Sequence, residues 1–234
     1  MIFHEQQKKK AVTFSYDDGV VQDIRLIELL NKYNLKCTFN INSELLAKRG
    51  ILIRNNMRIS HYKLCPEDIK YVYDGHEVAA HTLTHPNLTQ CDEKEIIRQV
   101  EGDRLRLSEL AGYEVVGMAY PCGGVNNDDR VAGVIKNNTG IKYSRTISAN
   151  GSFDVQKNLY RFDPTVYHLD FEKMMRLGEE FVSLKPESQR IFYIWGHSYE
   201  MDYGADYWVK LEEFFKLISN RDDIFYGTNK EILL

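Results

Sequence analysis

The chain has 234 residues, and its 34 acidic and 30 basic side chains give a formal charge of -4. Because the two signs are interspersed, no basic stripe is available for phosphates, and we do not expect nucleic acid as a partner. Residues 1–7 contain no signal-peptide core, and no later stretch is apolar for the length of a membrane span. We therefore expect a cytoplasmic protein without a membrane partner, although a secreted chain trimmed of its signal would look the same.

The length suits one domain over residues 1–234. Four cysteines, at positions 37, 65, 91 and 122, have neither the spacing of a zinc finger nor the density of a disulfide scaffold. We expect them to be mostly reduced thiols.

Strand-like and helix-like patterns alternate along the chain. An apolar run at residues 11–16 predicts the first strand, and it ends in Asp17, Asp18 and Gly19. Further strands are expected at 37–41, 76–80, 115–120, 141–147, 190–195 and 224–226. Helices are expected at 21–33, 43–48, 67–73, 92–111, 128–138, 170–184 and 206–219, whereas residues 51–64 have no clear pattern. About seven such alternations predict an α/β fold, a distorted (β/α) barrel of parallel strands.

In such a barrel, residues that directly follow different strands meet at one face. Four chemically distinctive clusters satisfy this condition: Asp17 with Asp18, then residues 81–85, 120–124 and 195–198. Neighbouring strand residues point to opposite sides, so Asp17 and Asp18 could hold different roles, one binding a cation and one transferring protons. An ordinary solvated turn is the alternative for these two acids alone.

His81 and His85 are four residues apart but lack the glutamate of the metalloprotease helix motif. Pro86 disfavours helical geometry at His85, which places the pair on a loop after a strand. Each histidine alone could be structural. Two imidazoles and one carboxylate at neighbouring strand ends, however, supply the three protein ligands of an open catalytic zinc site.

The motifs at residues 13–19, 81–85 and 195–197 resemble those of the polysaccharide deacetylase family, also known as carbohydrate esterase family four or the NodB homology domain. The resemblance covers nearly the whole chain. It implies Asp17 as general base and His197 as general acid. It also implies a divalent ion on Asp18, His81 and His85, expected to be Zn²⁺, with Co²⁺ or another transition metal as alternatives.

Two family motifs are altered. The third motif, Arg-x-Pro-(Tyr/Phe), holds the base with its arginine, but here residues 119–122 read Ala-Tyr-Pro-Cys. Arg145 or Arg161 could restore the positive charge from another strand. The fourth motif, an Asp-Trp pair that supports the acid histidine, has no convincing match, because neither Asp154 nor Asp163 is followed by tryptophan.

We expect substrate contacts from six residues: Tyr120, Pro121, Cys122, Arg145, His168 and Trp195. Aromatic residues after His197, such as Tyr199 and Tyr203, could stack on sugar rings, whereas Tyr207 and Trp208 are as well explained by helix packing.

The leading function is metal-dependent removal of N-acetyl or O-acetyl groups from a sugar or glycan. In this reaction Asp17 takes a proton from the attacking water and His197 protonates the departing amine. A hydrolase of small linear or cyclic amides is the first alternative. A catalytically silent carbohydrate-binding barrel is the second, and the presence of Asp17, Asp18, His81, His85 and His197 argues against it. The expected partner is therefore an acetylated carbohydrate or a small amide.

Overall fold

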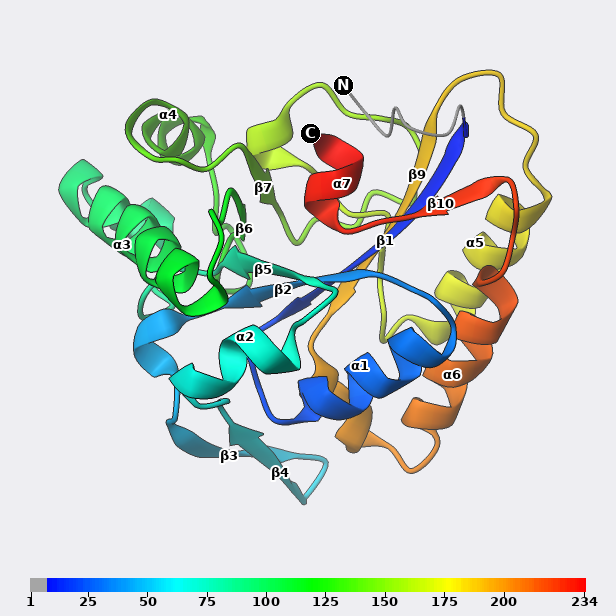
Figure 1. Ribbon diagram of the computed structural model, residues 1–234, viewed down its shortest axis with the longest axis horizontal. Coiled ribbons are helices and arrows are strands. Elements are labelled where there is room, and N and C mark those ends of the chain that lie inside the picture. The colour runs from blue at the N-terminus through cyan, green and yellow to red at the C-terminus, as the bar shows by residue number, and fades with distance from the viewer. Residues whose placement is uncertain (1–7) are drawn as a thin grey trace.

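A computed structural model describes residues 8–234, and its centre is a sheet of eight parallel strands (Figure 1). Strand β1 (Lys10–Asp17) pairs with β9 (Arg190–Gly196) on one side. Its other side is shared, because β10 (Ile224–Tyr226) pairs with the first half of β1 and β2 (Cys37–Ile41) with the second half. The remaining order is β7-β6-β5-β2-β1-β9-β8.

The outer strands are β5 (Glu77–Ala80), β6 (Gly117–Ala119), β7 (Tyr143–Arg145) and the two-residue β8 (Val166–Tyr167). Residues 162–168 join the two edges of the sheet. The amide of Phe162 donates to the Ser144 carbonyl on β7 at 3.0 Å, and the amide of Thr165 donates to the Tyr193 carbonyl on β9 at 2.8 Å. The sheet therefore curls into the distorted barrel that the sequence predicts.

Helices surround this sheet (Figure 1): α1 (Gln22–Lys32), α2 (Ile69–Val72), α3 (Glu93–Ala111), α4 (Asp129–Asn138), α5 (Phe171–Ser183), α6 (Tyr207–Ile218) and α7 (Asn229–Leu233). Asp92, Asp128 and Asp170 precede α3, α4 and α5, and each side chain accepts a hydrogen bond from an amide in the first turn. These N-caps satisfy amides that otherwise lack a partner, which explains why the helices begin where they do.

The segment without a clear pattern forms an antiparallel hairpin of β3 (Arg49–Arg54) and β4 (Met57–Tyr62). The expected helix at 43–48 is wrong: a 3-10 turn covers only Ser43–Leu45, and β3 starts four residues later. Asn55 and Asn56 both have positive φ in the two-residue turn, a conformation that asparagine tolerates and that joins short hairpins. Ile59 anchors the hairpin to the barrel by packing with Val20 and Tyr199.

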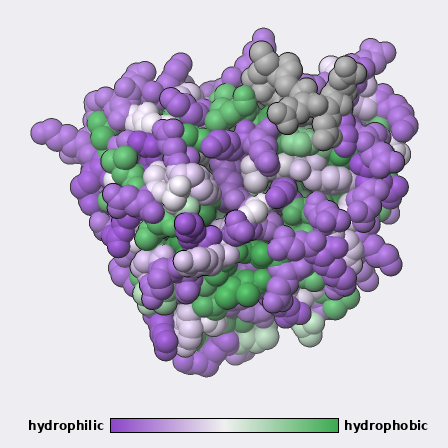
Figure 2. Space-filling view, in the orientation of Figure 1, coloured by the Kyte–Doolittle hydropathy of each residue, from purple (hydrophilic) through white to green (hydrophobic). Residues whose placement is uncertain are grey.

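The hairpin and α7 lie at opposite ends of the molecule (Figure 1). Hydrophilic residues cover most of the face drawn in Figure 2, and the hydrophobic residues on it occupy smaller areas between them. Within residues 8–234, no helix combines the length and the apolar character needed to cross a bilayer.

Candidate active site

The carboxyl ends of the strands surround a cavity of about 170 Å³. It is lined by Asp17, Asp18, His81, His85, Tyr120, Cys122, Gly123, Ile147, Trp195, His197 and Tyr199. All four clusters singled out in the sequence contribute to it. The parallel topology explains this, because each cluster directly follows a strand whose carboxyl end faces the same side of the barrel.

Asp17 ends β1 and is 2% exposed. The Arg145 Nη2 group donates to both of its carboxylate oxygens at 2.5 Å, and Asn40 Nδ2 donates to Oδ1 at 2.8 Å. Burial alone would raise the pKa of Asp17, but the positive charge of Arg145, with smaller contributions from His81 and His197, lowers that pKa below its ordinary value. Asp17 is therefore held ionised at neutral pH.

Arg145 lies on β7 directly beside Ala119 of β6 in the sheet register. Ala119 occupies the position of the arginine in the family's third motif. In this chain the positive charge beside Asp17 comes from the paired position on the neighbouring strand. Its guanidinium also lies over the Trp195 ring, 4.7 Å from the ring centre.

Asp18, His81 and His85 form a cluster that could hold a metal ion, since one ligand atom from each lies within 4.8 Å of the others. The Nδ1 group of His81 donates to the Ala119 carbonyl at 2.9 Å, which leaves Nε2 free for an ion. Burial lowers the pKa of His81 to about 4 and also lowers the pKa of His85. Both imidazoles are therefore neutral near pH 7, the form that binds metals, so the donor set fits a divalent transition metal.

Two residues of the hairpin region contact Asp18, and neither was expected from the sequence. Lys63 Nζ donates to the Asp18 backbone carbonyl at 2.7 Å and lies 3.2 Å from Oδ1, while His61 Nε2 lies 3.3 Å from Oδ2. Burial raises the pKa of Asp18, but Lys63 and the hydrogen bond from His61 outweigh it and hold that pKa well below its usual range. Asp18 is therefore ionised and oriented before any ion binds.

The backbone at the cavity is unusual. Asp18, Thr82, His85 and Cys122 all have φ between 63° and 86°. Non-glycine residues avoid this left-handed region, at a cost of about 1–3 kcal/mol each. Such strain concentrates at functional sites, where it aims side chains that regular strands would direct elsewhere.

His197 follows β9, and its Nε2 lies 4.0 Å from Asp17 Oδ2. Its Nδ1 group donates to Glu200 Oε2 at 2.9 Å. Burial lowers the pKa of His197, but the negative charge and hydrogen bond of Glu200, together with Asp17, raise it to about 9. His197 is therefore protonated at neutral pH.

Three expectations from the sequence need correction. Arg161 pairs with Asp129 at 2.7 Å on the outside of the barrel and does not support Asp17. Arg145 is fully buried below Asp17, so it cannot contact substrate. His168 is also fully buried, because its ring lies between Tyr16 and Glu200, and it does not line the cavity.

Of the remaining expected contact residues, Tyr120, Cys122 and Trp195 line the cavity and Pro121 does not. Tyr199 and Ile147 also line it. Trp208 packs against the Arg25 guanidinium and donates to Asp202, so it serves helix packing.

Residues 4–143 match the family model described as polysaccharide deacetylase. The peptidoglycan-N-acetylmuramic acid deacetylase PdaC of Bacillus subtilis is 26% identical over 125 residues, which span 52% of this chain and 23% of the relative. A chitooligosaccharide deacetylase of Rhizobium leguminosarum is 28% identical over 118 residues, which span 50% of this chain and 42% of the relative. The chain thus matches less than half the length of either relative.

Solved structures show the same fold. A deacetylase solved with substrate superimposes with a TM-score of 0.59 at 18% identity, over 95% of this chain and 90% of the other. A wild-type CE4 family pseudoenzyme from Bacillus anthracis superimposes with a TM-score of 0.56 at 18% identity, over 98% of this chain and 67% of the other.

The fold and the composition of the cavity thus define a deacetylase-type (β/α) barrel. The chain belongs to the polysaccharide deacetylase family.

Proposed function

We propose that the chain is a metal-dependent hydrolase that removes acetyl groups, from nitrogen or oxygen, on a sugar or glycan. One observation carries this proposal: a single cavity holds an ionised Asp17 and a protonated His197 beside the cluster of Asp18, His81 and His85. A hydrolysis that needs one base and one acid requires these two opposite protonation states at the same pH.

Asp18, His81 and His85 would hold the metal, for which we propose zinc. When bound, a divalent ion supplies Lewis-acid polarisation of the acyl oxygen and lowers the pKa of water towards neutrality. The residues support this because the two imidazoles are neutral and the carboxylate is ionised.

The proton transfers fall to two residues of the chain. Asp17 accepts a proton from the water that attacks the acyl carbon, and Arg145 keeps its carboxylate oriented for this step. His197 donates a proton to the departing amine as the carbon-nitrogen bond breaks. The products are acetate and a free amine, or an alcohol when the substrate is an ester.

The size of the cavity indicates that only the acyl end of a substrate enters it. Its volume of about 170 Å³ lies below the roughly 300–1,000 Å³ of pockets that enclose a whole drug-sized ligand. Tyr120, Ile147 and Trp195 give it partly apolar walls, which suit a methyl group. The rest of a sugar or glycan would remain outside the cavity.

A small-amide hydrolase is the second candidate, because the small cavity and the altered third motif also suit a small substrate. A catalytically silent barrel is the third candidate, and one protein of similar fold is a pseudoenzyme. In this chain, however, the base Asp17 is ionised and the acid His197 is protonated, as the reaction requires, which favours activity.

Acetate release tests the proposal. Chitooligosaccharides, peptidoglycan fragments, acetylated xylan and small N-acetyl amides would be incubated with the wild type and with Asp17→Asn. We expect release from at least one carbohydrate, reduced roughly 100-fold or more in the variant, the usual contribution of a positioned proton-transfer group. Release from small amides alone would favour the second candidate, and no release from any substrate by the metal-loaded protein would contradict both.

A further inference from the structure

Glu200 is a buried carboxylate without an assigned role, and it lies behind His197 on the side away from the cavity. We propose that Glu200 and His168 are positioning residues for His197, forming a buried relay that fixes the orientation of its ring with Nε2 towards the cavity. This inference rests on the proposed function, in which His197 is the general acid.

Glu200 is fixed to the same short segment as His197. It lies in the 3-10 turn Ser198–Tyr203 that directly follows β9. Its Oε2 accepts from the His197 Nδ1 group at 2.9 Å and from the His197 amide at 3.1 Å. With Nδ1 protonated towards Glu200, Nε2 faces Asp17 and the cavity, the position from which a proton can reach a substrate.

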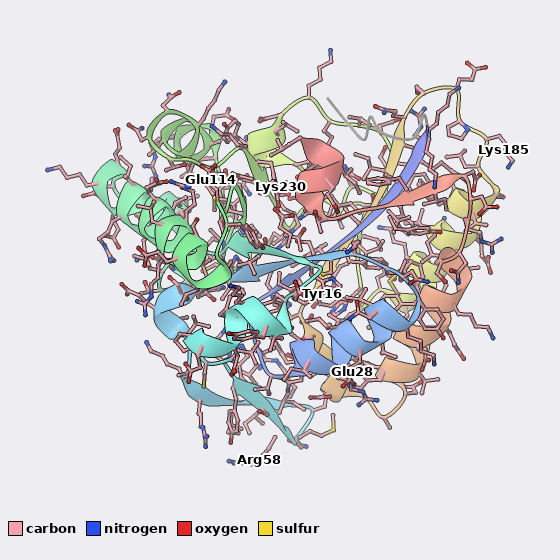
Figure 3. All side chains as sticks on the ribbon, in the orientation of Figure 1. Tyr16, Glu28, Arg58, Glu114, Lys185 and Lys230 are labelled. Atoms are coloured by element: carbon pink, nitrogen blue, oxygen red, sulfur yellow. The ribbon has the colours of Figure 1, made fainter. Side chains whose placement is uncertain are left out.

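His168 holds the other side of Glu200. Its Nε2 group donates to Glu200 Oε2 at 2.7 Å, and its Nδ1 lies 3.1 Å from the hydroxyl of Tyr16. The ring is fully buried, and burial lowers the pKa of His168. A neutral ring with Nε2 protonated can donate to Glu200 and accept from Tyr16, so both nitrogens have partners. Tyr16, labelled near the middle of the view in Figure 3, is itself fully buried.

The second oxygen of Glu200 is also occupied, because the hydroxyl of Tyr167 donates to Oε1. A carboxylate with both oxygens bound cannot rotate without breaking hydrogen bonds. Glu200 is therefore held by Tyr167 of β8 as well as by His197 at the start of its own turn.

Gly196 makes the close approach of His168 possible. A Cβ atom added at Gly196 would lie 2.2 Å from Cδ2 of the His168 ring, so the ring packs directly on the backbone of β9. The amide of His168 donates to the Trp195 carbonyl at 2.9 Å. The backbone bond holds the His168 segment against β9, and the ring then lies against the Gly196 backbone.

The charges around His197 are consistent with this relay. Glu200 from the turn and Asp17 and Asp18 from the end of β1 favour its protonated form, whereas His168 and His85 would oppose it if they were charged. Both of these histidines have lowered pKa values and stay neutral near pH 7. Glu200, whose own pKa is lowered, then provides the largest stabilisation of the His197 charge.

The relay takes the place of the family's fourth motif, the Asp-Trp pair that supports the acid histidine and has no match in this sequence. Glu200 is the residue three positions after His197, and His168 directly follows β8. The relay is therefore a feature of this chain's own residues.

The test compares two leaving groups. Glu200→Gln keeps the shape of the side chain but removes its charge. We expect it to lose roughly 10- to 100-fold in kcat/KM on an N-acetyl amide, part of the 100- to 10,000-fold that a general acid supplies. On an activated acetyl ester, whose leaving group needs no proton, the loss should be less than threefold. The alkaline limb of the pH profile on the amide should move to lower pH. His168→Gln should show the same pattern, more weakly.

A double-mutant cycle with His197→Gln separates positioning from structure. If Glu200 acts through His197, adding Glu200→Gln to His197→Gln should cause no further loss on the amide. Glu77→Gln is the matched control, because Glu77 is a buried glutamate that accepts from Thr38, Tyr143 and the Lys230 amide, away from the cavity lining. It should lower Tm without any dependence on the leaving group.

Equal losses by Glu200→Gln on amide and ester, or full additivity with His197→Gln, would overturn the relay even if the variant remained folded. Failure of the proposed function looks different, because His197→Gln itself would then show no dependence on the leaving group. If Glu200→Gln does not fold, Tyr167→Phe removes only the hydroxyl on Oε1, and the absence of any leaving-group dependence in this variant would also count against the relay.

Discussion

Asp17 illustrates how a single side chain depends on residues far away in the sequence. The arginine that supports it belongs to β7, 128 residues along the chain, and pairs in the sheet with Ala119 of β6. The sequence could not show which of Arg145 and Arg161 supports Asp17, because it does not show which strand ends lie side by side. Register across the sheet decides between them, and register is a property of the folded barrel.

The first prediction concerns Arg145. In Arg145→Gln, Asp17 loses its ionic partner inside a buried site, so its pKa should rise and the acid limb of kcat/KM should move to higher pH. Breaking a buried pair also leaves an unpaired charge, which costs about 3–5 kcal/mol of the free energy of unfolding. A pH profile and a thermal melt measure the two effects. Arg161→Gln is the control and should change neither, while an unshifted acid limb in Arg145→Gln would contradict the role given to Arg145.

The second prediction concerns His197 and pH. The folded-state pKa of His197 is about 9, above the ordinary 6.5, so the protonated form persists at neutral pH and is lost as pH rises through about 9. kcat/KM on an N-acetyl amide should therefore fall above about pH 9. The ion pair with Glu200 contributes stability that is fully present below pH 6.5. This stability is lost as the pH rises through about 9. A rate that still increased at pH 10 would show that deprotonation of His197 does not limit the reaction.

At the scale of elements, periodicity predicted most helices and strands. The last strand, β10, has the expected bounds 224–226, and α3 to α6 begin and end within one residue of those expected. The hairpin β3–β4 was not predictable, because Leu52 and Ile59 pack in a small cluster with Tyr199 and Tyr203 rather than in the main core. Most residues of the hairpin are therefore only partly buried or exposed, and its sequence lacks a clear apolar alternation.

Glu200 was missed for a related reason. A glutamate three residues after a histidine has no meaning until a 3-10 turn brings the two side chains together. The positive φ values at Asp18, Thr82, His85 and Cys122 are likewise invisible in the sequence, since none of these residue types requires that conformation.

The third prediction concerns the hairpin. Ile59 is 4% exposed and anchors β4 against Val20 and Tyr199. Ile59→Ala should cost about 2 kcal/mol or more and loosen the hairpin. Faster amide hydrogen exchange should appear at residues 49–62, together with a lower kcat/KM, because this hairpin brings His61 and Lys63 to Asp18. Unchanged exchange in the hairpin would mean that Ile59 does not anchor it. Ile53→Ala is the control, since Ile53 is 54% exposed.

At the scale of the whole molecule, the cavity lies at one end of the barrel, and an apolar cluster that includes residues of α7 lies away from it. At the end opposite the hairpin, α7 places Asn229 against Thr13, Thr38 and Ser15, and Ile232 and Leu233 pack with the barrel residues Ala11 and Tyr193. Ser15 in turn accepts from Asn40 and Arg145, which both hold Asp17. Polar contacts thus run through the barrel from α7 to the base.

The fourth prediction tests this division. Ile232 is fully buried, so Ile232→Ala should cost about 2–5 kcal/mol. For a domain of this size each kcal/mol lowers Tm by roughly 2–4 °C. Activity at 25 °C should stay within twofold of the wild type, because the apolar contacts of Ile232 lie away from the cavity. A large loss of activity in a variant that remains folded would show that the two ends are coupled.

The fifth prediction bears on the central proposal, that Asp18, His81 and His85 hold the metal of a metal-dependent deacetylase. Elemental analysis of the purified protein should find one divalent transition metal per chain, zinc in our proposal. The His81→Ala and His85→Ala double variant should lose the metal, while Asp17→Asn should keep it. If the double variant retained the metal content of the wild type, the assignment of this site would be wrong.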